Sequence, residues 1–392
     1  MADLVGLAWE LTSVTGWGVY GTNLVLELLR RGQPAPVLLK RPARLELDPV
    51  RMGLLAPLVR QQTQLVEQLK RGGRMQPGNV PFPVIKTLTS TFEPMTAGRW
   101  FFGKPDLGVI FFENTRFAPE SLARARQYAR VICGSTWNAA VLRGQGLDNV
   151  ELVLQGIDPS LFHPAVRHKL VRDRFVVFSG GKAEHRKGQD IVLAAFKRFH
   201  ARHPEALLLT AWQSPWPEKS ADLAQSPHGL GAPPVKDGTI DVGAWAVSNG
   251  LPPGSVLDVG LVANDKVPRM LGQCDCAVFA SRYESGTNLP AMEAMACGLP
   301  VVLSDNTGHK DLIDGSRCYP LRRQAPVRHV PAGWGSDGWG ESDVDELVES
   351  LEAIHGDRAE ADRRGTAAAA WMRSELSWTR QVSRFVDVLS LS

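Results

Sequence analysis

Cysteine is scarce in this chain, and its five cysteines form no Cys-x-x-Cys pair. A disulfide framework is therefore not expected, and buried free thiols in a reducing compartment are the favoured interpretation. No apolar run reaches the roughly 18 residues that a membrane-spanning helix requires. The first ten residues contain acids and no basic leader, so a signal peptide is not predicted.

A large charge excess is also lacking. The 44 basic and 41 acidic residues leave a formal net charge of +3, which is too small to indicate a nucleic-acid partner. The hydrophobic fraction of 44% and the charged fraction of 22% are ordinary for a globular protein. A length of 392 residues suffices for two domains that each bury a core.

Short apolar segments alternate along the chain with segments of helical periodicity. Such alternation predicts an α/β protein built on doubly wound parallel sheets. A polar, basic linker at 164–174 divides the chain into predicted domains at 1–164 and 165–376. The expected strands cover residues 4–11, 37–39, 84–88, 107–112 and 130–133, and then 175–179, 207–212, 256–261, 276–279 and 301–303.

The stretch from 274 to 312 organises the second domain. A buried strand leads through a polar turn into a small apolar helix at 289–297, for which Asn288 is a candidate N-cap and Pro290 lies in the first turn. The N–H groups and the dipole at such a helix start attract anions. Glu293 alone breaks the apolar pattern of the helix, and a carboxylate beside an anion site suits sugar or ribose hydroxyls.

A glycine turn opens the second domain, directly after the expected strand at 175–179. Gly181 lies in this turn, and Lys182, Arg186 and Lys187 follow at the start of the next helix. A diphosphate needs this combination of free backbone N–H groups and cations. A cluster of solvated charges is the alternative interpretation.

Residues 293–301 read GluAlaMetAlaCysGlyLeuProVal. They resemble the donor-site signature of the retaining glycosyltransferases of family 4, which have the GT-B fold of two Rossmann-like domains facing a cleft. In that family, two glutamates are separated by seven residues, and the second opens this motif. Here Glu284 and Glu293 are separated by eight residues, and Ser285 occupies the usual register of the first glutamate. The resemblance is strong from 175 to 310 and weak before residue 105.

The resemblance implies that the first domain holds the acceptor and the second binds the donor, while a terminal helix at 377–392 packs back on the first domain. Lys187 matches the phosphate-binding lysine of the family, and Lys182 or Arg186 stands near a family arginine. The residues expected to bind the donor lie in the glycine loops, among the cations and at the helix start: Gly16, Gly18, Gly181, Lys182, Arg186, Lys187, Gly286, Thr287, Asn288, Leu289 and Glu293.

Gly16, Gly18 and Gly21 of the first domain satisfy the pattern G-x-G-x-x-G. In the resembled family, a glycine loop here faces the cleft and approaches the donor diphosphate and the acceptor. A nicotinamide-dependent oxidoreductase is the alternative. Its fingerprint should follow the strand directly, but residues 12–15 intervene, and a bulky Trp17 separates two of the glycines.

No histidine precedes position 163, although the resembled family often has one in its first domain. Glu113 follows an expected strand at its carboxyl end, where doubly wound sheets bind ligands. It is therefore a candidate to fill the space of that histidine, with a helix-capping or surface role as the alternative. His309, in the second domain, is predicted to be a turn or capping residue rather than a catalyst.

Residues 49–70 keep helical spacing and predict an amphipathic helix packed on the first domain. The alternative is a basic face, including Arg51, Arg60, Lys70 and nearby arginines, that meets anionic lipid or a lipid-linked acceptor.

Residues 213–237 of the second domain are rich in Pro, Ser and Gly and predict a surface insertion, which contains Lys219.

Trp334 and Trp339 lie in an irregular segment of the second domain. They are expected to pack against the protein, and stacking on acceptor sugars is the alternative.

These patterns predict an enzyme that transfers a sugar from a nucleoside diphosphate sugar to a glycan, lipid-linked or other hydroxyl acceptor, with retention. The candidate catalytic residues are Lys187, Glu284 and Glu113, and Lys187 is expected to face an empty anion site before the donor binds. No Asp-x-Asp stands at a strand end, so neither a metal ion nor another cofactor is expected. The resemblance implies that the leaving phosphate itself takes the acceptor proton.

A nucleotide-sugar epimerase of the same fold and a noncatalytic nucleotide-sugar-binding protein are the alternatives in function. The predicted location is cytoplasmic, with peripheral contact at the inner face of the membrane as an alternative. The sugar, the base, the acceptor and the oligomeric state stay open at this point.

Overall fold

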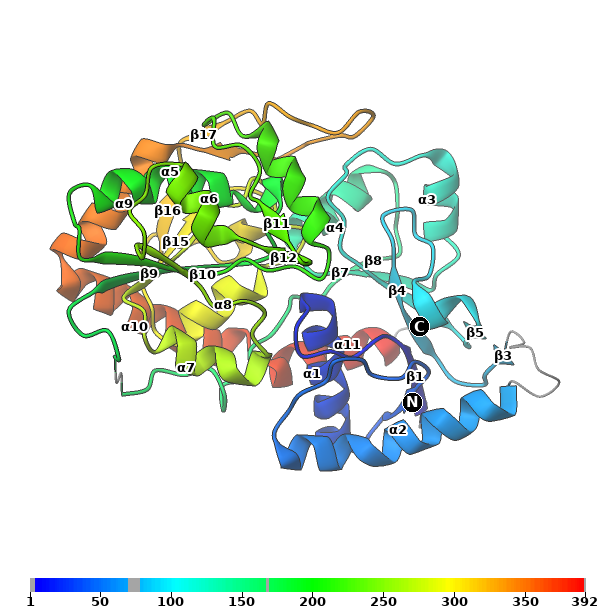
Figure 1. Ribbon diagram of the computed structural model, residues 1–392. Helices are drawn as coiled ribbons and strands as arrows, with labels where there is room; N and C mark the ends of the chain where they lie inside the picture. Colours follow the sequence, from blue (N-terminus) through cyan, green and yellow to red (C-terminus); the bar gives the residue numbers. More distant parts are fainter. Residues whose placement is uncertain (1–3, 70–77, 167–168, 391–392) are drawn as a thin grey trace.

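The computed structural model describes residues 4–69, 78–166 and 169–390, and it contains two α/β units side by side (Figure 1). The first unit is built on a six-stranded sheet in the order β2-β1-β4-β6-β7-β8, with every neighbouring pair parallel. Its strands are β1 (Leu4–Ala8), β2 (Ala35–Leu38), β4 (Val84–Leu88), β6 (Asp106–Ile110), β7 (Arg130–Cys133) and β8 (Val150–Leu152).

Helices and short elements surround this first sheet. The helices are α1 (Gly16–Arg31), α2 (Pro49–Leu69), α3 (Pro119–Ala125) and α4 (Thr136–Gly144). The short elements are the strand pair β3 (Gly78–Asn79) and β5 (Phe101–Phe102) and the 3-10 turn η1 (Thr96–Arg99).

The second unit repeats the architecture with a parallel sheet in the order β13-β10-β9-β14-β15-β16. Its strands are β9 (Phe175–Gly180), β10 (Ala206–Ala211), β13 (Val256–Asp258), β14 (Cys276–Phe279), β15 (Val301–Ser304) and β16 (Tyr319–Leu321). Its helices are α5 (Gln189–His200), α6 (Val242–Ser248), α7 (Val267–Leu271), α8 (Leu289–Ala296), α9 (Val344–Gly356) and α10 (Arg358–Glu375). Its short elements are the hairpins β11 (Val235–Lys236)–β12 (Thr239–Ile240) and β17 (Gln324–Ala325)–β18 (Glu341–Ser342), and the 3-10 turns η2 (His185–Lys187), η3 (Pro217–Gln225), η4 (Asn264–Lys266) and η5 (Thr307–Asp311).

Both sheets are doubly wound, which confirms the predicted fold class. The strand order reverses between β1 and β4 in the first sheet and between β9 and β14 in the second. Open parallel sheets bind ligands in the crevice outside the carboxyl ends of the strands at such a reversal. The loops after β9 and β14, residues 181–188 and 280–288, therefore occupy the position where a ligand is expected.

The central strands are buried on both faces because helices cover both sides of each sheet. All residues of β9 and β14 are buried, and so are the apolar residues of α8 apart from Pro290. The five cysteines, all within the described residues, form no disulfide with one another; four of them are buried and Cys297 is half-buried. Burial raises the pKa of the Cys133 thiol to about 12, so this thiol is inert packing material at neutral pH.

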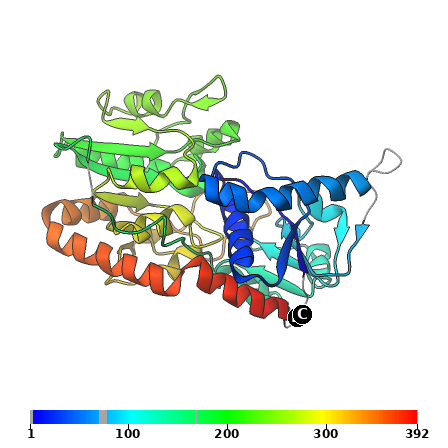
Figure 2. The ribbon, with the colours of Figure 1, turned by 90° about the horizontal axis from the view of Figure 1, so that it is seen from below.

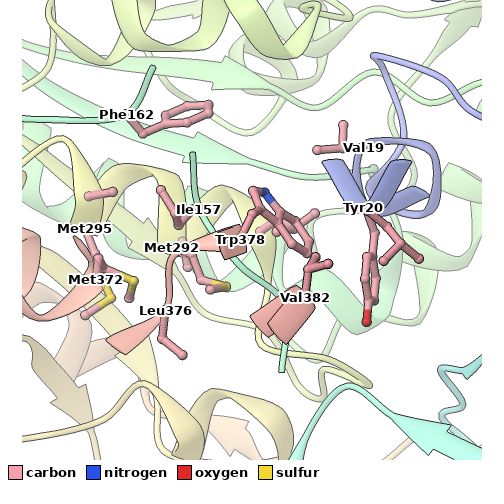
Figure 3. Packing of buried hydrophobic residues seen from close by; sticks show 14 of the residues in the cluster. Val19, Tyr20, Ile157, Phe162, Met292, Met295, Met372, Leu376, Trp378 and Val382 are labelled. Atoms are coloured by element: carbon pink, nitrogen blue, oxygen red, sulfur yellow. The ribbon is translucent and has the colours of Figure 1, made fainter. Parts of the chain in front are cut away.

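The last helix, α11 (Trp378–Ser390), runs from the second unit back along the first (Figure 2). Its entry is tied to the first unit by two backbone hydrogen bonds: the Ile157 N–H donates to Leu376 at 2.7 Å, and the Trp378 N–H donates to Ile157 at 2.9 Å. The Trp378 ring lies 5.1 Å from the Tyr20 ring of α1 (Figure 3). The buried face of α11 thus belongs to the same apolar cluster as α1.

The two described basic residues of helix α2, Arg51 and Arg60, differ in exposure, and Arg60 is exposed. Arg51 points inward and pairs with Asp48 and with Asp158, whereas Leu54 is 53% exposed. Lys70 lies outside the described residues, as do Arg71 and Arg74. No helix within the described ranges is long and apolar enough to cross a membrane.

Some strands end earlier than their apolar pattern predicts. The strand expected at 256–261 stops at Asp258, whose Oδ1 accepts hydrogen bonds from Thr210 Oγ1 at 2.8 Å and from the Trp212 N–H at 3.1 Å. Because the Asp258 carboxylate binds β10 and the residue that follows it, the chain stops pairing with β10 after this residue. Leu257 and Leu261 are exposed, and they contribute no core.

Candidate functional site

The loop after β9 is shaped by two glycines with positive φ. Gly181 has φ +122°, and the side chain of Lys187 packs above it, with Cδ at 3.6 Å from a hypothetical Cβ. Gly188 has φ +67°, and a Cβ there would lie 2.0 Å from the Ala280 carbonyl oxygen. Only glycine permits this approach. The cationic turn η2 is therefore pressed against the end of β14.

The centre of the site is an ion pair between these two loops. Lys187 Nζ lies 2.6 Å and 2.8 Å from the two carboxylate oxygens of Glu284, and the side chains are only 11% and 4% exposed. Arg186 Nη1 lies 3.6 Å from the same carboxylate. The expectation that Lys187 faces an empty anion site was wrong, because Glu284 already neutralises it.

The charges of this centre are strongly coupled. Burial alone would raise the pKa of Glu284, but Lys187 and Arg186 outweigh burial and hold it at about 2, so the carboxylate is ionised. Burial lowers the pKa of Lys187, while Glu284 opposes that shift. Burial would also lower the pKa of Arg186, yet Glu184, Glu113 and Glu284 together raise it. The site thus holds more than one fixed cation against buried carboxylates.

Arg282 fixes the position of the cationic turn η2 through buried ion pairs and hydrogen bonds. Its guanidinium is fully buried and pairs with Asp190 at 2.8 Å and with Glu341 at 2.6 Å. It also donates to the His185 carbonyl at 2.5 Å, and its backbone N–H donates to the Arg186 carbonyl at 2.8 Å. The turn that carries the cations is therefore fixed by a network that the sequence did not reveal, because its members are 92 and 59 residues apart.

Asn288 occupies the N-cap position of α8 but does not cap it. Its φ is +65°, and its amide donates instead to Glu284 Oε1 at 3.1 Å and lies 2.9 Å from His309 Nε2. Within the described part of the chain, no side chain caps α8. The capping expectation for Asn288 was wrong. Pro290 has no N–H and the Ala291 N–H donates to the Asn288 carbonyl at 3.0 Å, so the Leu289 N–H is the group at this helix start that is left for a ligand.

His309 lies in the 3-10 turn η5, and it also contacts the residues of the site. It is completely buried in η5 and contacts Asn288. Burial lowers its pKa to about 4, with Glu284 opposing the shift, so the imidazole is neutral at pH 7. Nothing in its sequence neighbourhood marks this position, because its partners come from the loop after the preceding strand.

Glu293 lies on the buried face of α8, and Asn264 of η4 is its hydrogen-bond partner at 2.5 Å. Burial raises the pKa of Glu293 to about 8, and Asn264 only partly offsets this effect. The backbone N–H of Asn264 in turn donates to the Ser13 carbonyl of the first unit at 2.9 Å. Glu293 is thus a carboxyl at the junction of the two units with one neutral partner.

The glycines of the first unit are required by packing. A Cβ on Gly18 would lie 2.3 Å from Thr12 Oγ1, and one on Gly21 would lie 2.9 Å from the Trp9 ring. The Thr15 side chain caps α1 by accepting from the Gly18 N–H at 3.2 Å. The helix start that a dinucleotide would need is therefore already satisfied. Gly18, one of the glycines predicted to approach the donor, packs against Thr12 of its own unit.

Gly16 does reach the second unit. A Cβ at this position would lie 3.9 Å from Leu289 Cδ1 at the start of α8. The turn before α8 also meets the first unit, since Ser135 Oγ donates to the Ser285 carbonyl at 2.8 Å. Thr287 Oγ1 and its N–H donate to Gln155 Oε1 at 3.2 Å and 3.3 Å. The predicted donor-side turn is thus held between the units.

Glu113 lies across from the cationic turn, close enough for its charge to raise the pKa of Arg186. Its backbone carbonyl accepts a hydrogen bond from Trp339 Nε1 at 3.2 Å. The Trp339 ring stacks on Tyr283 with centroids 3.7 Å apart and planes at 14°. Trp339 is thus a packing residue that joins Glu113 to the loop after β14, while Trp334 is 37% exposed.

The segment 213–237 is more than a surface insertion. Asp222 of η3 accepts a hydrogen bond from the His185 N–H at 2.8 Å, and Leu223 is buried. Lys182 and Lys219 lie over the Trp216 ring, at 5.3 Å and 5.4 Å from its centroid. The segment therefore covers one side of the cationic turn, and Lys219 is a neighbour of the site.

The structure thus brings most of the predicted residues together. Two facing doubly wound units with a cationic site at the second strand reversal define the GT-B class of protein. The second unit carries the family match: residues 173–322 match the model of glycosyl transferases group 1, and residues 263–385 match that of family 4 glycosyltransferases in conflict systems. The first match covers less than half of the chain, and it identifies the second unit as a glycosyl transferases group 1 domain.

Several solved structures share the whole fold. Sucrose-phosphate synthase from Thermosynechococcus elongatus has a TM-score of 0.65 at 16% identity, over 99% of this chain and 98% of its own. HepE from Anabaena in complex with UDP-glucose has a TM-score of 0.64 at 16% identity, over 99% of each chain. A glycosyltransferase from Rickettsia africae has a TM-score of 0.62 at 12% identity, over 99% of this chain and 97% of its own. None of the curated proteins matches the sequence.

Proposed function

We propose that the protein transfers a sugar, with retention and without a metal ion, from a nucleoside diphosphate sugar to a hydroxyl of a glycan or lipid-linked acceptor. The observation that carries this proposal is the buried pair of Lys187 and Glu284, with Arg186 beside it. The pair joins the two loops at the strand reversal of the second sheet, directly before the uncapped start of α8.

A donor diphosphate fits this surface by charge and by hydrogen bonding. The Leu289 N–H at the start of α8 would bind a phosphate oxygen, and Lys187 and Arg186 supply positive charge. Glu284 already offsets Lys187, so the diphosphate competes for that lysine with a fixed carboxylate. The phosphate gains charge as the sugar departs, and the competition then shifts in its favour. Such a shift stabilises the transition state more than the ground state.

Glu293 is the proposed ribose partner. Its only hydrogen-bond partner among the described residues is the Asn264 amide at 2.5 Å, which leaves carboxyl oxygen capacity for two neighbouring hydroxyls. HepE was solved in complex with UDP-glucose. That likeness supports a nucleotide donor here and makes UDP-glucose the first compound to assay.

Retention is proposed from the scarcity of bases at the centre. Burial lowers the pKa of His309 to about 4, which makes its imidazole a weak base, and the Glu284 carboxylate is held by Lys187 and Ser281. The departing phosphate is therefore the base that we assign to the acceptor proton. Glu113 is the one predicted catalytic carboxylate from the first domain, and we propose that it orients the acceptor.

The test combines donor binding with product analysis. Calorimetry with UDP-, GDP-, ADP- and dTDP-sugars should show one preferred donor, and transfer to an acceptor mixture should release the nucleotide. NMR of the product should show the anomeric configuration of the donor. Activity should persist in EDTA without added magnesium or manganese.

The alternatives give different results. An epimerase would convert the donor sugar with no acceptor present, and a noncatalytic binder would retain the donor intact. Complete loss of transfer in EDTA, restored by manganese, would refute metal independence while leaving the donor site in place. We propose a cytoplasmic location for this reaction, where nucleotide sugars are made.

A further inference from the structure

A second cluster of ionisable groups lies at the opposite edge of the second sheet. His203 and Glu205 flank Pro204 in the turn that leads into β10, and they therefore lie at the amino end of that strand. Glu352 and His355 lie three residues apart in the last turns of α9, so they share one face of the helix. Helices α5 and α9 pack against each other, as Figure 1 shows, and this brings the two pairs together.

Three ligand atoms of this cluster have a spacing suited to a metal ion. Glu205 Oε1 lies 3.7 Å from His203 Nδ1 and 3.4 Å from His355 Nε2. The three atoms all lie within 4.8 Å of one another. Tetrahedral zinc with bonds of about 2.0–2.2 Å places its ligand atoms roughly 3.3–3.5 Å apart. Small side-chain rotations would therefore complete the coordination.

The second nitrogen of His203 orients this imidazole. Nε2 lies 2.9 Å from Glu352 Oε2, so the proton is on Nε2 and the lone pair of Nδ1 faces Glu205. A carboxylate that holds the remote nitrogen of a ligand histidine is a common partner in metal sites. Arg202 Nε lies 3.0 Å from the other oxygen of Glu352 and fixes that carboxylate.

The surroundings make the cluster rigid. The His203 N–H donates to the Phe199 carbonyl at 3.0 Å, and the His203 carbonyl accepts from the Ala206 N–H at 2.9 Å. The Phe199 ring lies 4.5 Å from the His203 ring, and the Phe175 ring lies 4.9 Å from the His355 ring. The two imidazoles therefore pack on aromatic side chains. The Glu205 side chain is 43% exposed, so the cluster is accessible from solvent on that side.

The other histidine–carboxylate group in the second unit lacks this capacity. His228 lies 3.5 Å from Glu341, and Asp190 completes the group. The buried guanidinium of Arg282 already pairs with both carboxylates. The positive charge of the Arg282 guanidinium therefore already neutralises the two carboxylates that a metal ion would require as ligands.

We propose that His203, Glu205 and His355 bind one Zn²⁺ ion, with water as the fourth ligand and Glu352 as the orienting partner of His203. Two imidazoles and one carboxylate suit zinc better than magnesium or calcium, which prefer oxygen ligands. The ion joins the end of α9 to the turn before β10. It stabilises the second unit and takes no part in sugar transfer, because the cationic site lies at the other ends of the strands.

The test uses the full chain without a histidine tag, treated with a chelator and dialysed. Calorimetric titration with zinc chloride should show one equivalent bound and a raised Tm. His203→Ala and His355→Ala should each weaken zinc binding by roughly 100-fold, since each removes one of three protein ligands. Glu352→Gln should weaken it by about 10–100-fold. His163→Ala, at an exposed histidine directly before the linker, should leave zinc affinity unchanged.

Crystals soaked in zinc should give an anomalous peak at the zinc edge between His203, Glu205 and His355. Circular dichroism and nucleotide-sugar binding of each variant establish that it is folded. Absence of zinc binding to the wild-type chain, wild-type zinc affinity in both histidine variants, or a peak elsewhere would overturn the proposal. Sugar-transfer rates should be equal with and without zinc, so a rate abolished by chelation and restored only by zinc would overturn the structural role.

Discussion

Glycines occupy equivalent places in the two units: the loop after β1, residues 9–15, leads into the glycines of α1, and the loop after β9 carries Gly181 and Gly188. In the first unit the glycines accommodate packing, because Gly18 and Gly21 have no room for a side chain against Thr12 and Trp9. In the second unit Gly188 accommodates the backbone itself, at positive φ and against the Ala280 carbonyl. Similar glycine content therefore has two different causes.

The surroundings of the two loops differ in charge. The first loop is enclosed by aromatic rings, with Trp9 at 5.4 Å from Trp17 and at 5.1 Å from Tyr20. The second carries buried cations paired with Glu184 and Glu284. Anion binding thus depends on charged side chains and open N–H groups near the glycines, and the glycines alone do not indicate it. The family models match the second unit alone.

The largest expected effect is that of Lys187→Ala, which acts on the charged loop. We expect kcat/KM to fall by roughly 100-fold if the lysine supplies about 3 kcal/mol to the transition state. Stability should fall as well, by about 1–3 kcal/mol, because the buried Glu284 carboxylate loses its closest cation and keeps Arg186, Ser281 and Asn288 as partners. Steady-state kinetics and denaturant unfolding measure the two losses.

Two companion variants separate chemistry from folding. Lys236→Ala, at an exposed lysine of the β11–β12 hairpin, should change neither quantity. Lys187→Met combined with Glu284→Gln should recover most of the stability and none of the activity. If the double variant regains activity along with stability, Lys187 is a structural residue and the donor site lies elsewhere.

The next effect tests the aromatic loop. Gly18→Ala should destabilise the protein by about 1–3 kcal/mol, because its Cβ would meet the Thr12 backbone nitrogen at 2.5 Å. Gly16→Ala, whose Cβ would meet only Leu289 at 3.9 Å, should leave stability unchanged. Thermal unfolding distinguishes them, and equal Tm values would show that the first loop is not held by packing.

Glu293→Gln should reveal its effect through pH. Burial raises the pKa of Glu293 to about 8, from 4.5 in the unfolded chain. Between these values the folded state retains a proton that the unfolded state has lost, so the wild-type protein loses stability as the pH rises through this range. Glutamine cannot ionise. The variant should match the wild type near pH 4.5 and exceed its Tm by roughly 2–4 °C above pH 8.

Donor affinity is the second quantity to measure for Glu293→Gln. If Glu293 holds ribose hydroxyls, Glu293→Gln should weaken donor binding by about tenfold, the equivalent of 1.4 kcal/mol. An unchanged donor affinity together with a lowered Tm would mean that Glu293 only complements the start of α8.

The smallest effect is expected for Lys182→Ala. Its side chain is 35% exposed, and its partner Glu184 retains Arg186 at 2.7 Å. Burial lowers the pKa of Lys182, and the nearby Arg186 adds to this shift. An exposed ion pair contributes at most about 1 kcal/mol, so we expect a rise in the donor KM of roughly threefold. A loss as large as that of Lys187→Ala would place the diphosphate nearer to Lys182.

Much of the fold and part of the site follow from local sequence. The alternation of apolar and helical segments is sufficient to predict two doubly wound sheets, because each period reports which face of an element is buried. The motif from Glu293 to Val301 and the cations after Gly181 likewise indicate an anion site, since both lie at a strand end followed by a helix start. These features depend on residues that are neighbours along the chain.

Only the tertiary structure determined which of these residues act on one another. Lys187 and Glu284 are 97 residues apart, and they meet because β9 and β14 are adjacent in the sheet. The same adjacency of strand ends turns Asn288 away from capping and toward His309, and it places Arg282 between Asp190 and Glu341. A sequence pattern indicates which face of a single helix or strand is buried. Strand order, in contrast, determines which loops face each other. Because the cations and carboxylates of the site lie on different loops, only the tertiary structure shows how they pair.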